Sequence, residues 1–461
     1  MTLPDVVVIG AGPAGLAAAI EASGQGARVL LVDEGARPGG QIFRQSTPGI
    51  GGPPVLTAGE AARRRRLLAR YDAARGAIDE RFGTAVTANF DGLQVLVADD
   101  TSSRLVQPKA VVLATGLSEL TVPFPGWTLP GVVTAGALQT LLKADAIRAG
   151  NRIALAGTGP LLLAVAAQLV TAGADVRAVA LLNSPWTALR HPFAMWGARA
   201  VVRDGLSYLA TLRRAGVPVL VGWGPLAAEG GTAVERLALA PHGGDGRLKA
   251  EHRKVFEVDT VGVNFGFTAN SELARMAGVP VRFDARRGGW LPERQDDGAT
   301  QVPGLYVAGD GAGLGGALAA ESDGRIAGAA AAAFAGYPAK GSLAEAYRAR
   351  ARHWRFQAAI APQFELPPAV WDWATDDTVI CRCEGVRRAR IERTIADGHV
   401  TLNAIKRNSR SGMGLCGGRV CLRSVLALSG HADDAAAAPM AARPGLKPVT
   451  LAALANRIEE A

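Results

Sequence analysis

All four cysteines of this 461-residue chain lie within a window of 41 residues near its carboxyl end. Cys381 and Cys383 stand one residue apart in CRCE, and Cys416 and Cys421 follow in a C-x4-C arrangement. Thiolates that converge from two loops can bind zinc or a [2Fe–2S] cluster. The alternative is a set of buried or free thiols with no common ligand. The clustering therefore predicts one shared ligand set for Cys381, Cys383, Cys416 and Cys421.

The residues around these cysteines favour iron and sulfide. Structural zinc sites usually use C-x2–4-C pairs, and a plant-type ferredoxin also has a different spacing. Glycines in the second loop leave backbone N–H groups free to point at sulfur; they are residues 412, 414, 417 and 418. Arginines near both loops can offset the charge of an anionic cluster; they are residues 382, 387, 388, 390 and 410. Zinc and unliganded thiols stay open as alternatives on these residues alone.

A second pattern with chemical meaning lies at the amino end. A short apolar run at 6–9 ends in Gly10-x-Gly12-x-x-Gly15, an Ala-rich stretch follows, and a second apolar run ends at Asp33. The three glycines suit a tight turn, a close backbone approach to a pyrophosphate, and packing of helix on strand. The helix N-terminus offers N–H groups to phosphate, and Asp33 or the adjacent Glu34 can accept hydrogen bonds from a ribose. The spacing predicts a dinucleotide site.

Three later stretches indicate which dinucleotide binds. PGGQIFR follows at 38–44, KAVVLATG closes a strand at 109–116, and GLYVAGDGAG follows another strand at 304–313. With the first motif, they resemble two-dinucleotide-domain flavoproteins of the thioredoxin reductase and glutathione reductase type. In that superfamily PGGQ runs beside the flavin, ATG marks the crossover, and the GD aspartate contacts the ribityl–phosphate chain. The resemblance implies FAD, with contacts from Gly10, Gly12, Gly15, Asp33, Glu34, Gly40, Gln41, Arg44, Val86, Thr115, Gly116, Gly309, Asp310 and Ala317.

Residues 151–183 repeat the strand, glycine turn, helix and strand as a degraded copy. Gly157 and Gly159 remain, but Leu162 stands at the third glycine position. Leu182 and Asn183 stand where NAD would need an acid and NADP an arginine. A domain kept for its architecture, or for another nucleotide such as ATP, is therefore preferred to one that binds NAD(P)H productively.

The cysteine region and its surroundings resemble one family over nearly the whole chain. CRCE followed by R-x-G-M-G-x-C-x-G-R-x-C is similar to the small [2Fe–2S] domain of bacterioferritin-associated ferredoxin (BFD), and PFPGWTLPGVVTAGALQTLLK at 123–143 strengthens the match. The family comprises the iron–sulfur subunits of opine oxidases, hydrogen cyanide synthases and dye-linked proline or hydroxyproline dehydrogenases. Gly417 departs from it, since a glutamine commonly follows the third cysteine. That residue is not a ligand, so metal binding is not in doubt.

The resemblance implies an α/β two-dinucleotide-binding-domain flavoprotein with a small C-terminal [2Fe–2S] domain. The expected units are an FAD domain at 1–116 and 296–338, an inserted NAD(P)-like domain at 117–295, a connector at 339–375, the cluster domain at 376–430, and a tail at 431–461. The tail is expected to have an Ala/Pro linker before a short helix that packs on this or a neighbouring subunit.

The chain offers no recognisable catalytic residues of its own. No C-x-x-C dithiol lies in the flavin or nucleotide regions, which excludes disulfide reductase chemistry, and no constellation forms around its six histidines, at 191, 242, 252, 353, 399 and 431. The resemblance implies that substrate is oxidised on a partner subunit of the amino-acid-oxidase type, in a hetero-oligomer that can include a further small subunit. This chain would receive electrons, with FMN at the subunit boundary in some relatives, and pass them to a quinone or dye.

Composition narrows the remaining function classes. The net charge of +9 comes from 43 arginines and 7 lysines that are scattered along an Ala-rich chain. The dense run Arg63–Arg66 has no interleaved aromatic residues, so a solvated helix face is preferred to a nucleic-acid site. The absence of a targeting segment and the clustered cysteines predict a cytoplasmic protein, with peripheral contact with the inner membrane as a further option. The competing functions are a stand-alone NAD(P)H-dependent reductase and a zinc-stabilised binding protein.

Overall fold

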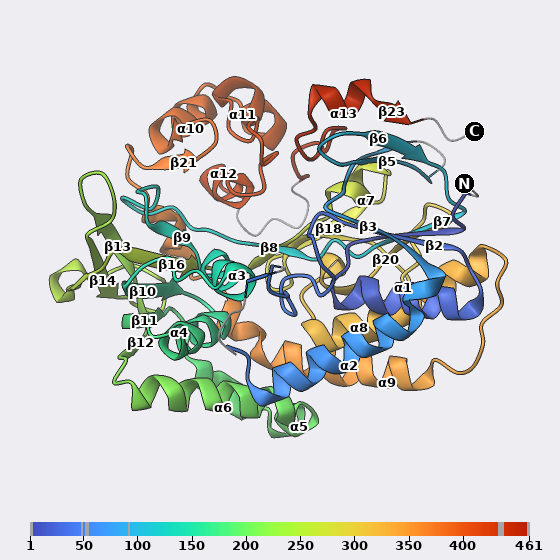
Figure 1. Ribbon diagram of the computed structural model, residues 1–461. Coiled ribbons are helices and arrows are strands. Elements are labelled where there is room, and N and C mark those ends of the chain that lie inside the picture. The colour runs from blue at the N-terminus through green and yellow to red at the C-terminus, as the bar shows by residue number, and fades with distance from the viewer. Residues whose placement is uncertain (1–2, 48, 51–54, 91–92, 432–437, 459–461) are drawn as a thin grey trace.

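The computed structural model describes residues 3–47, 49–50, 55–90, 93–431 and 438–458, and Figure 1 shows how they are arranged. Two parallel β-sheets lie side by side, and a small helical unit that contains the cysteines lies above one of them, at the upper left in Figure 1. In the described part of the chain, no helix is both long enough and apolar enough to span a bilayer.

The first sheet is built from the amino-terminal glycine motif. Its five parallel strands have the order β20-β7-β1-β2-β3 and are β1 (Val6–Ile9), β2 (Val29–Asp33), β3 (Ile78–Phe82), β7 (Ala110–Leu113) and β20 (Leu305–Val307). β1, β2 and β7 are rich in Val, Ile and Leu, as expected of strands that are covered on both faces, whereas the edge strand β3 has the more polar sequence IDERF. One face packs on α1 (Pro13–Gln25), α2 (Ala58–Ala74) and α8 (Ala317–Phe334). The other packs on a meander of β4 (Ala85–Phe90), β5 (Gln94–Ala98) and β6 (Ser103–Val106).

The second sheet repeats this plan. Its parallel strands have the order β12-β11-β10-β16-β9 and are β9 (Val132–Thr134), β10 (Arg152–Gly157), β11 (Asp175–Leu181), β12 (Val219–Val221) and β16 (Thr260–Asn264). One face packs on α3 (Ala135–Asp145), α4 (Leu161–Thr171) and α6 (Arg199–Arg214). The antiparallel strands β13 (Trp223–Glu229), β14 (Arg236–Pro241) and β15 (Lys254–Glu257) lie on the other. The chain crosses between the sheets through β8 (Leu117–Glu119) and β17 (Phe267–Ala269), which pair antiparallel.

The arginine run lies on α2 and takes part in packing between helices. Arg63 forms an ion pair of 2.6 Å with Asp204 of α6, and Arg66 forms one of 3.6 Å with Glu321 of α8. The Thr57 side chain and Glu60 form a capping box at the start of α2. These contacts give the run a structural role on the outside of both sheets.

The cysteine-bearing unit follows α9 (Ala344–Ile360) and the short helices η6 (Ala361–Phe364) and η7 (Pro368–Asp372). It comprises β21 (Val379–Cys381), β22 (Val386–Arg387), α10 (Arg388–Ala396), α11 (Leu402–Ser409) and α12 (Leu422–Leu428). Its core includes Phe283 and Trp290 from the hairpin of β18 (Val281–Asp284) and β19 (Gly289–Pro292). The hairpin therefore fixes the cysteine unit to the rest of the chain. The expected domain boundaries remain predictions, because packing alone does not delimit a folding unit.

The end of the chain returns to the first sheet. After residues 432–437, which lie outside the described part, come α13 (Leu451–Ala455) and β23 (Arg457–Ile458). β23 pairs in parallel with β6, so the tail packs on its own chain, at the upper right in Figure 1.

Candidate functional site

The glycines of the first motif meet the later motifs at the carboxyl edge of the first sheet. Gly10 has φ +103°, and a Cβ there would collide with the Ala114 carbonyl oxygen. A Cβ on Gly40 would lie 2.7 Å from the Cα of Gly12. The PGGQ segment therefore lies directly against the glycine turn.

The GD loop reaches the same edge. A Cβ on Gly309 would lie 2.6 Å from the Cβ of Ala14, and one on Gly311 would lie 3.0 Å from Oγ1 of Thr115. Asp310 is half-buried, desolvation raises the pKa of its carboxyl, and its Oδ1 accepts hydrogen bonds from the N–H groups of Gly315 and Gly316. These bonds place Asp310 beside the first residue of α8, Ala317.

The crossover residues Thr115 and Gly116 are fixed by Asn270. The Thr115 hydroxyl donates to the Asn270 carbonyl at 2.7 Å, and the Asn270 side-chain amide donates back to the Thr115 carbonyl at 2.9 Å. The Asn270 N–H also bonds to the Gly116 carbonyl at 3.1 Å. Asn270 therefore holds the predicted crossover next to the GD loop, where Gly311 approaches Thr115.

The two acidic candidates have different surroundings. Asp33 is half-buried, which raises the pKa of its carboxyl, and it accepts hydrogen bonds from the N–H groups of Ala11 (2.5 Å) and Gly35 (2.6 Å). Its carboxylate thus lies beside the glycine turn. Glu34 instead forms an ion pair of 2.7 Å with Lys447 of the tail. Of the two, Asp33 is the one that faces the glycine turn.

Arg44 and Val86, two of the remaining predicted contacts, have different surroundings. Arg44 donates to the Gln41 side chain at 2.8 Å, whereas its Nε is buried and has no partner in the described part of the chain. Val86 is buried in β4. A buried donor without an acceptor is costly, so Arg44 is suited to an additional ligand.

These features fit FAD. The first turn of α1 begins with Gly12 and Pro13 and has no side-chain cap, so its N–H groups can bind a pyrophosphate. The glycine turn, the PGG segment and the GD loop converge on one edge of the sheet. The contact of each named residue with FAD remains a prediction.

The glycine turn of the second motif is covered by the chain itself. A Cβ on Gly159 would lie 2.5 Å from the ring of Phe364, in η6 of the connector. The Asn183 side chain donates to the carbonyl of Glu365 at 2.6 Å and to that of Gln363 at 3.3 Å. Asn183 stands where a ribose-binding acid would be, and here it binds the connector. The connector therefore fills the groove that a pyridine nucleotide would need.

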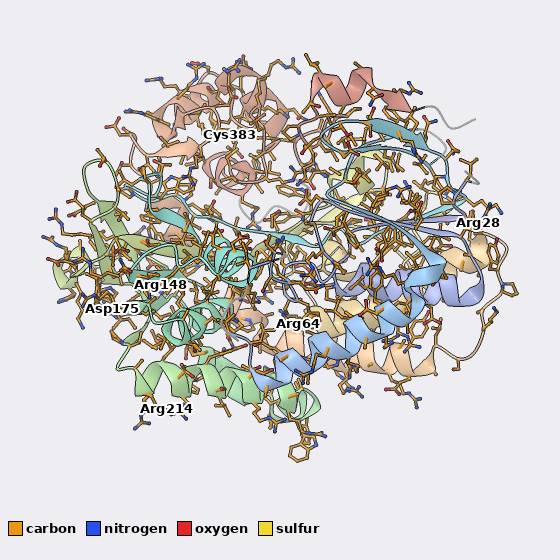
Figure 2. The ribbon with its side chains drawn as sticks, viewed as in Figure 1. Arg28, Arg64, Arg148, Asp175, Arg214 and Cys383 are labelled. Carbon is orange, nitrogen blue, oxygen red and sulfur yellow. The ribbon has the colours of Figure 1, made fainter. Side chains whose placement is uncertain are left out.

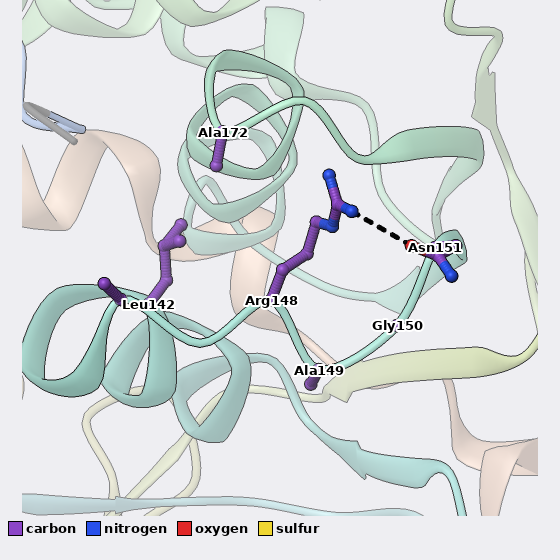
Figure 3. A pocket seen from close by; sticks show the side chains of 7 residues that line it. Leu142, Arg148, Ala149, Gly150, Asn151 and Ala172 are labelled. Carbon is purple, nitrogen blue, oxygen red and sulfur yellow. Dashed lines mark hydrogen bonds between the residues drawn. The ribbon is translucent and has the colours of Figure 1, made fainter. Parts of the chain in front are cut away.

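The pocket in Figure 3 is at the other edge of this sheet. Its volume is about 450 Å³, and its lining includes Arg148, Gly150 and Asn151, which precede β10. Arg148 donates to the Asn151 side chain across the pocket mouth at 3.0 Å. The glycine turn follows β10, so this pocket lies at the opposite end of the strand from the nucleotide groove.

The four cysteines converge as two interacting pairs. Cys381 and Cys421 are buried and share a hydrogen bond between their side chains. Cys383 is exposed and lies beside the half-buried Cys416. Figure 2 labels Cys383 in the cysteine unit, across the molecule from Arg214 on α6.

The charge of the sulfur atoms depends on these contacts. The hydrogen bond with Cys421, aided by the N–H groups of Gly412 (3.4 Å) and Glu384, lowers the pKa of Cys381 to about 6 against the effect of burial. The same side-chain bond and burial raise the pKa of Cys421 well above its ordinary value. Burial raises the pKa of Cys383. The N–H groups that point at Cys381 are of the kind that supports a bound thiolate.

This arrangement fits a cluster with two metal ions. The four thiols form two pairs, and each iron of a [2Fe–2S] cluster takes two ligands.

Two residues at these candidate sites escaped the sequence reasoning. Phe364 lies in a Pro-flanked connector without periodicity, and nothing in its neighbourhood predicts contact with a turn some 200 residues earlier. Arg419 lies between Cys416 and Cys421 and forms an ion pair of 2.9 Å with Glu272 of α7 (Glu272–Met276). The position of Arg419 between two predicted metal ligands was the one sequence feature that could have identified it.

Comparison with known families identifies both parts of the chain. Residues 4–336 match the pyridine nucleotide-disulphide oxidoreductase family, and residues 379–428 match the BFD-like [2Fe-2S] binding domain. The first match covers the two sheets and the second covers all four cysteines. FAD and a [2Fe–2S] cluster are therefore the cofactors of this chain, which decides against zinc.

Relatives of similar length share both parts. Hydrogen cyanide synthase subunit HcnB of Pseudomonas aeruginosa is 34% identical over 90% of each chain. An opine oxidase subunit from Agrobacterium tumefaciens is 35% identical over 98% of this chain and 91% of its own. The solved structure of L-proline dehydrogenase from P. horikoshii covers 98% of this chain and 79% of its own with a TM-score of 0.68 and 20% identity, which bears on the fold. The chain belongs to the family of oxidoreductase subunits that includes hydrogen cyanide synthase subunit HcnB and the corresponding opine oxidase subunits.

Proposed function

We propose that this chain is the electron-transfer subunit of an amine- or imino-acid dehydrogenase. In this proposal, a partner flavoprotein of the amino-acid-oxidase type oxidises the substrate, and this chain passes the electrons to a quinone or a dye. The relatives are named as subunits of opine oxidase and hydrogen cyanide synthase, which supports an oxidoreductase complex and an opine as one candidate substrate. Proline-type and glycine-type substrates belong to the same proposal. An additional FMN at the subunit boundary and a further small subunit belong to the same proposal.

The observation that carries the proposal is the filled second groove. A stand-alone NAD(P)H reductase needs that groove open beside its flavin domain, whereas Phe364 and Asn183 hold the connector in it. Electrons would then have to reach this chain from another protein.

The residues of the chain have matching roles in this proposal. When bound, FAD supplies two-electron chemistry and the cluster supplies one-electron chemistry. Cys381, Cys383, Cys416 and Cys421 would hold the irons, and the Gly412 N–H would tune the potential through Cys381. The exposed Cys383 would bring one edge of the ligand set to the surface, where a second protein or a carrier can approach.

Co-purification with the product of the neighbouring gene tests this function. The complex is then assayed for dye reduction with opines, proline analogues, glycine and sarcosine. We expect a complex that reduces dye with a substrate of this class, and this chain alone should have no such activity. Anaerobic bleaching of the flavin of the isolated chain by NADPH would support the reductase alternative instead.

A further inference from the structure

The tail after residue 438 connects the cysteine loops with the adenosine end of the FAD groove. We define this segment, residues 438–458, as the strap. It contains Pro439, Pro444 and Pro448, which favour an extended, stiff backbone. In Figure 1 it leads from the helical unit toward β5 and β6.

One end of the strap is anchored on the cysteine unit. Met440 is buried in the core that contains Cys381 and Cys421. A Cβ on Gly412 would lie 2.6 Å from its Sδ, and one on Gly418 would lie 3.2 Å from it. The Ala441 N–H donates to the side chain of Asn403, in α11, at 3.1 Å.

The middle of the strap lies on the FAD side. The N–H groups of Gly445 and Leu446 donate to the carbonyl of Thr87 in β4, at 3.1 and 2.9 Å. The Leu446 side chain packs on the core beneath the first sheet. Lys447 forms its ion pair with Glu34, next to Asp33 at the end of β2. A carboxylate in that position marks the ribose of the adenosine moiety in dinucleotide folds.

The cysteine loop also contacts the strap directly. Arg419 donates to the Leu446 carbonyl at 3.4 Å and pairs with Glu272 through its Nε. The same residue therefore connects Cys416–Cys421, the strap and α7. A folded cysteine loop supports the part of the strap that lies beside the ribose position.

We infer that the strap closes the adenosine end of the FAD site, and that FAD retention depends on the folded cysteine unit through it. Leu446 and Lys447 are positioning residues, because they act through the closure of the groove. The inference takes FAD as the nucleotide of the first sheet and does not depend on the proposed electron transfer. It adds that retention of FAD depends on the folded cysteine unit, whether or not electrons pass between the two cofactors.

The test measures release of FAD from the holoprotein. The Leu446→Asp/Lys447→Glu variant should release FAD about tenfold faster, since it loses the apolar contact of a partly buried leucine and one ion pair. Asn403→Ala, on the cysteine side, should also speed release although it is remote from β2. Leu451→Asp is the matched control, because Leu451 lies in the same tail and is 84% exposed. Its FAD release should equal that of the wild type.

Flavin fluorescence after rapid dilution gives the release rate, and iron content with the paramagnetic resonance signal shows that the cluster stays intact. Leu446→Ala, a milder change, serves if the double variant does not fold. Equal rates in the wild type and the Leu446 variants would overturn the inference, as would equally fast release in the Leu451 control. If the proposed electron-transfer function were wrong, the complex would transfer no electrons while the rates of FAD release still differed between the variants as expected. Failure of the proposed function can therefore be distinguished from failure of this inference.

Discussion

Cys421 is buried and shares a hydrogen bond with Cys381, so its replacement tests the shared ligand set most directly. Cys421→Ser should lose iron and acid-labile sulfide, because a serine hydroxyl is a far poorer ligand for iron than a thiolate. Iron analysis and paramagnetic resonance after dithionite reduction provide the measurement. Full iron content with an unchanged signal would show that Cys421 is not a ligand.

Gly417→Gln is the matched control in the same loop. It introduces the glutamine that is common in the family at a position that is not a ligand. Gly417 has φ +60° and open space around it, so the change should cost only about 1–2 kcal/mol of stability. The variant should keep its iron and its signal.

The connector element decides whether a pyridine nucleotide can bind. Wild-type protein should show no thermal shift with millimolar NADH or NADPH, because Phe364 covers Gly159. Phe364→Ala should open the turn and give a positive shift, since a ligand that binds only the folded state raises its stability. Phe193→Ala is the control, as Phe193 is 93% exposed. If NADH or NADPH raised the melting temperature of the wild type by as much as that of Phe364→Ala, Phe364 would not be what prevents the nucleotide from binding.

The last turn of helix α3 contains a buried lysine beside the PGGQIFR segment. Lys143 donates to the carbonyl of Ile42 at 3.1 Å, and burial lowers its pKa from 10.5 to about 8. Below pH 8 the folded state must hold this charge, which disfavours folding. Between pH 8 and 10.5 only the unfolded chain binds the proton, so rising pH stabilises the fold.

Lys143→Met should therefore stabilise the fold at pH 7, by up to roughly 3 kcal/mol less the lost hydrogen bond to Ile42. The advantage should shrink as the pH rises from 8 to 10.5. Urea unfolding across this range provides the measurement, and Lys340→Met is the control at an exposed lysine. If the free energy of unfolding of Lys143→Met differed from that of the wild type by the same amount at every pH between 7 and 10, the pKa of Lys143 would not be lowered in the folded state.

The elements differ in how far the sequence predicts them. The β1-α1-β2 unit follows from local spacing, because Gly10, Gly12, Gly15 and Asp33 lie within one strand–helix–strand repeat. The four cysteines are equally local. The contact of Phe364 with Gly159 joins residues about 200 positions apart and leaves no periodic trace, so only the structure reveals it. The same holds for Lys447, whose partner Glu34 is at the other end of the chain.

At the scale of the whole molecule, the two cofactor sites face different surroundings. The FAD groove lies at the edge of a sheet that is covered on both faces. The cysteine loops reach the surface, where Leu415 is 79% exposed beside Cys416 and Met413 is also exposed. Exposed apolar residues next to a redox centre suit a transient contact with another redox protein or carrier. This face is therefore where we expect electrons to pass between this chain and another molecule.

Leu415→Asp tests this expectation. A charge at the centre of the face should weaken docking and raise the KM for the acceptor, or the Kd for the partner, about tenfold. The cluster signal and FAD content should remain unchanged, because Leu415 is not a ligand. Val400→Asp, at a residue 52% exposed in the same unit but outside the cysteine loops, should leave the KM and the Kd as they are. The opposite result would be an unchanged KM and Kd in Leu415→Asp together with a change in either constant in Val400→Asp. Electron exchange would then use another surface, and the exposed edge at Cys383 would have no role in it.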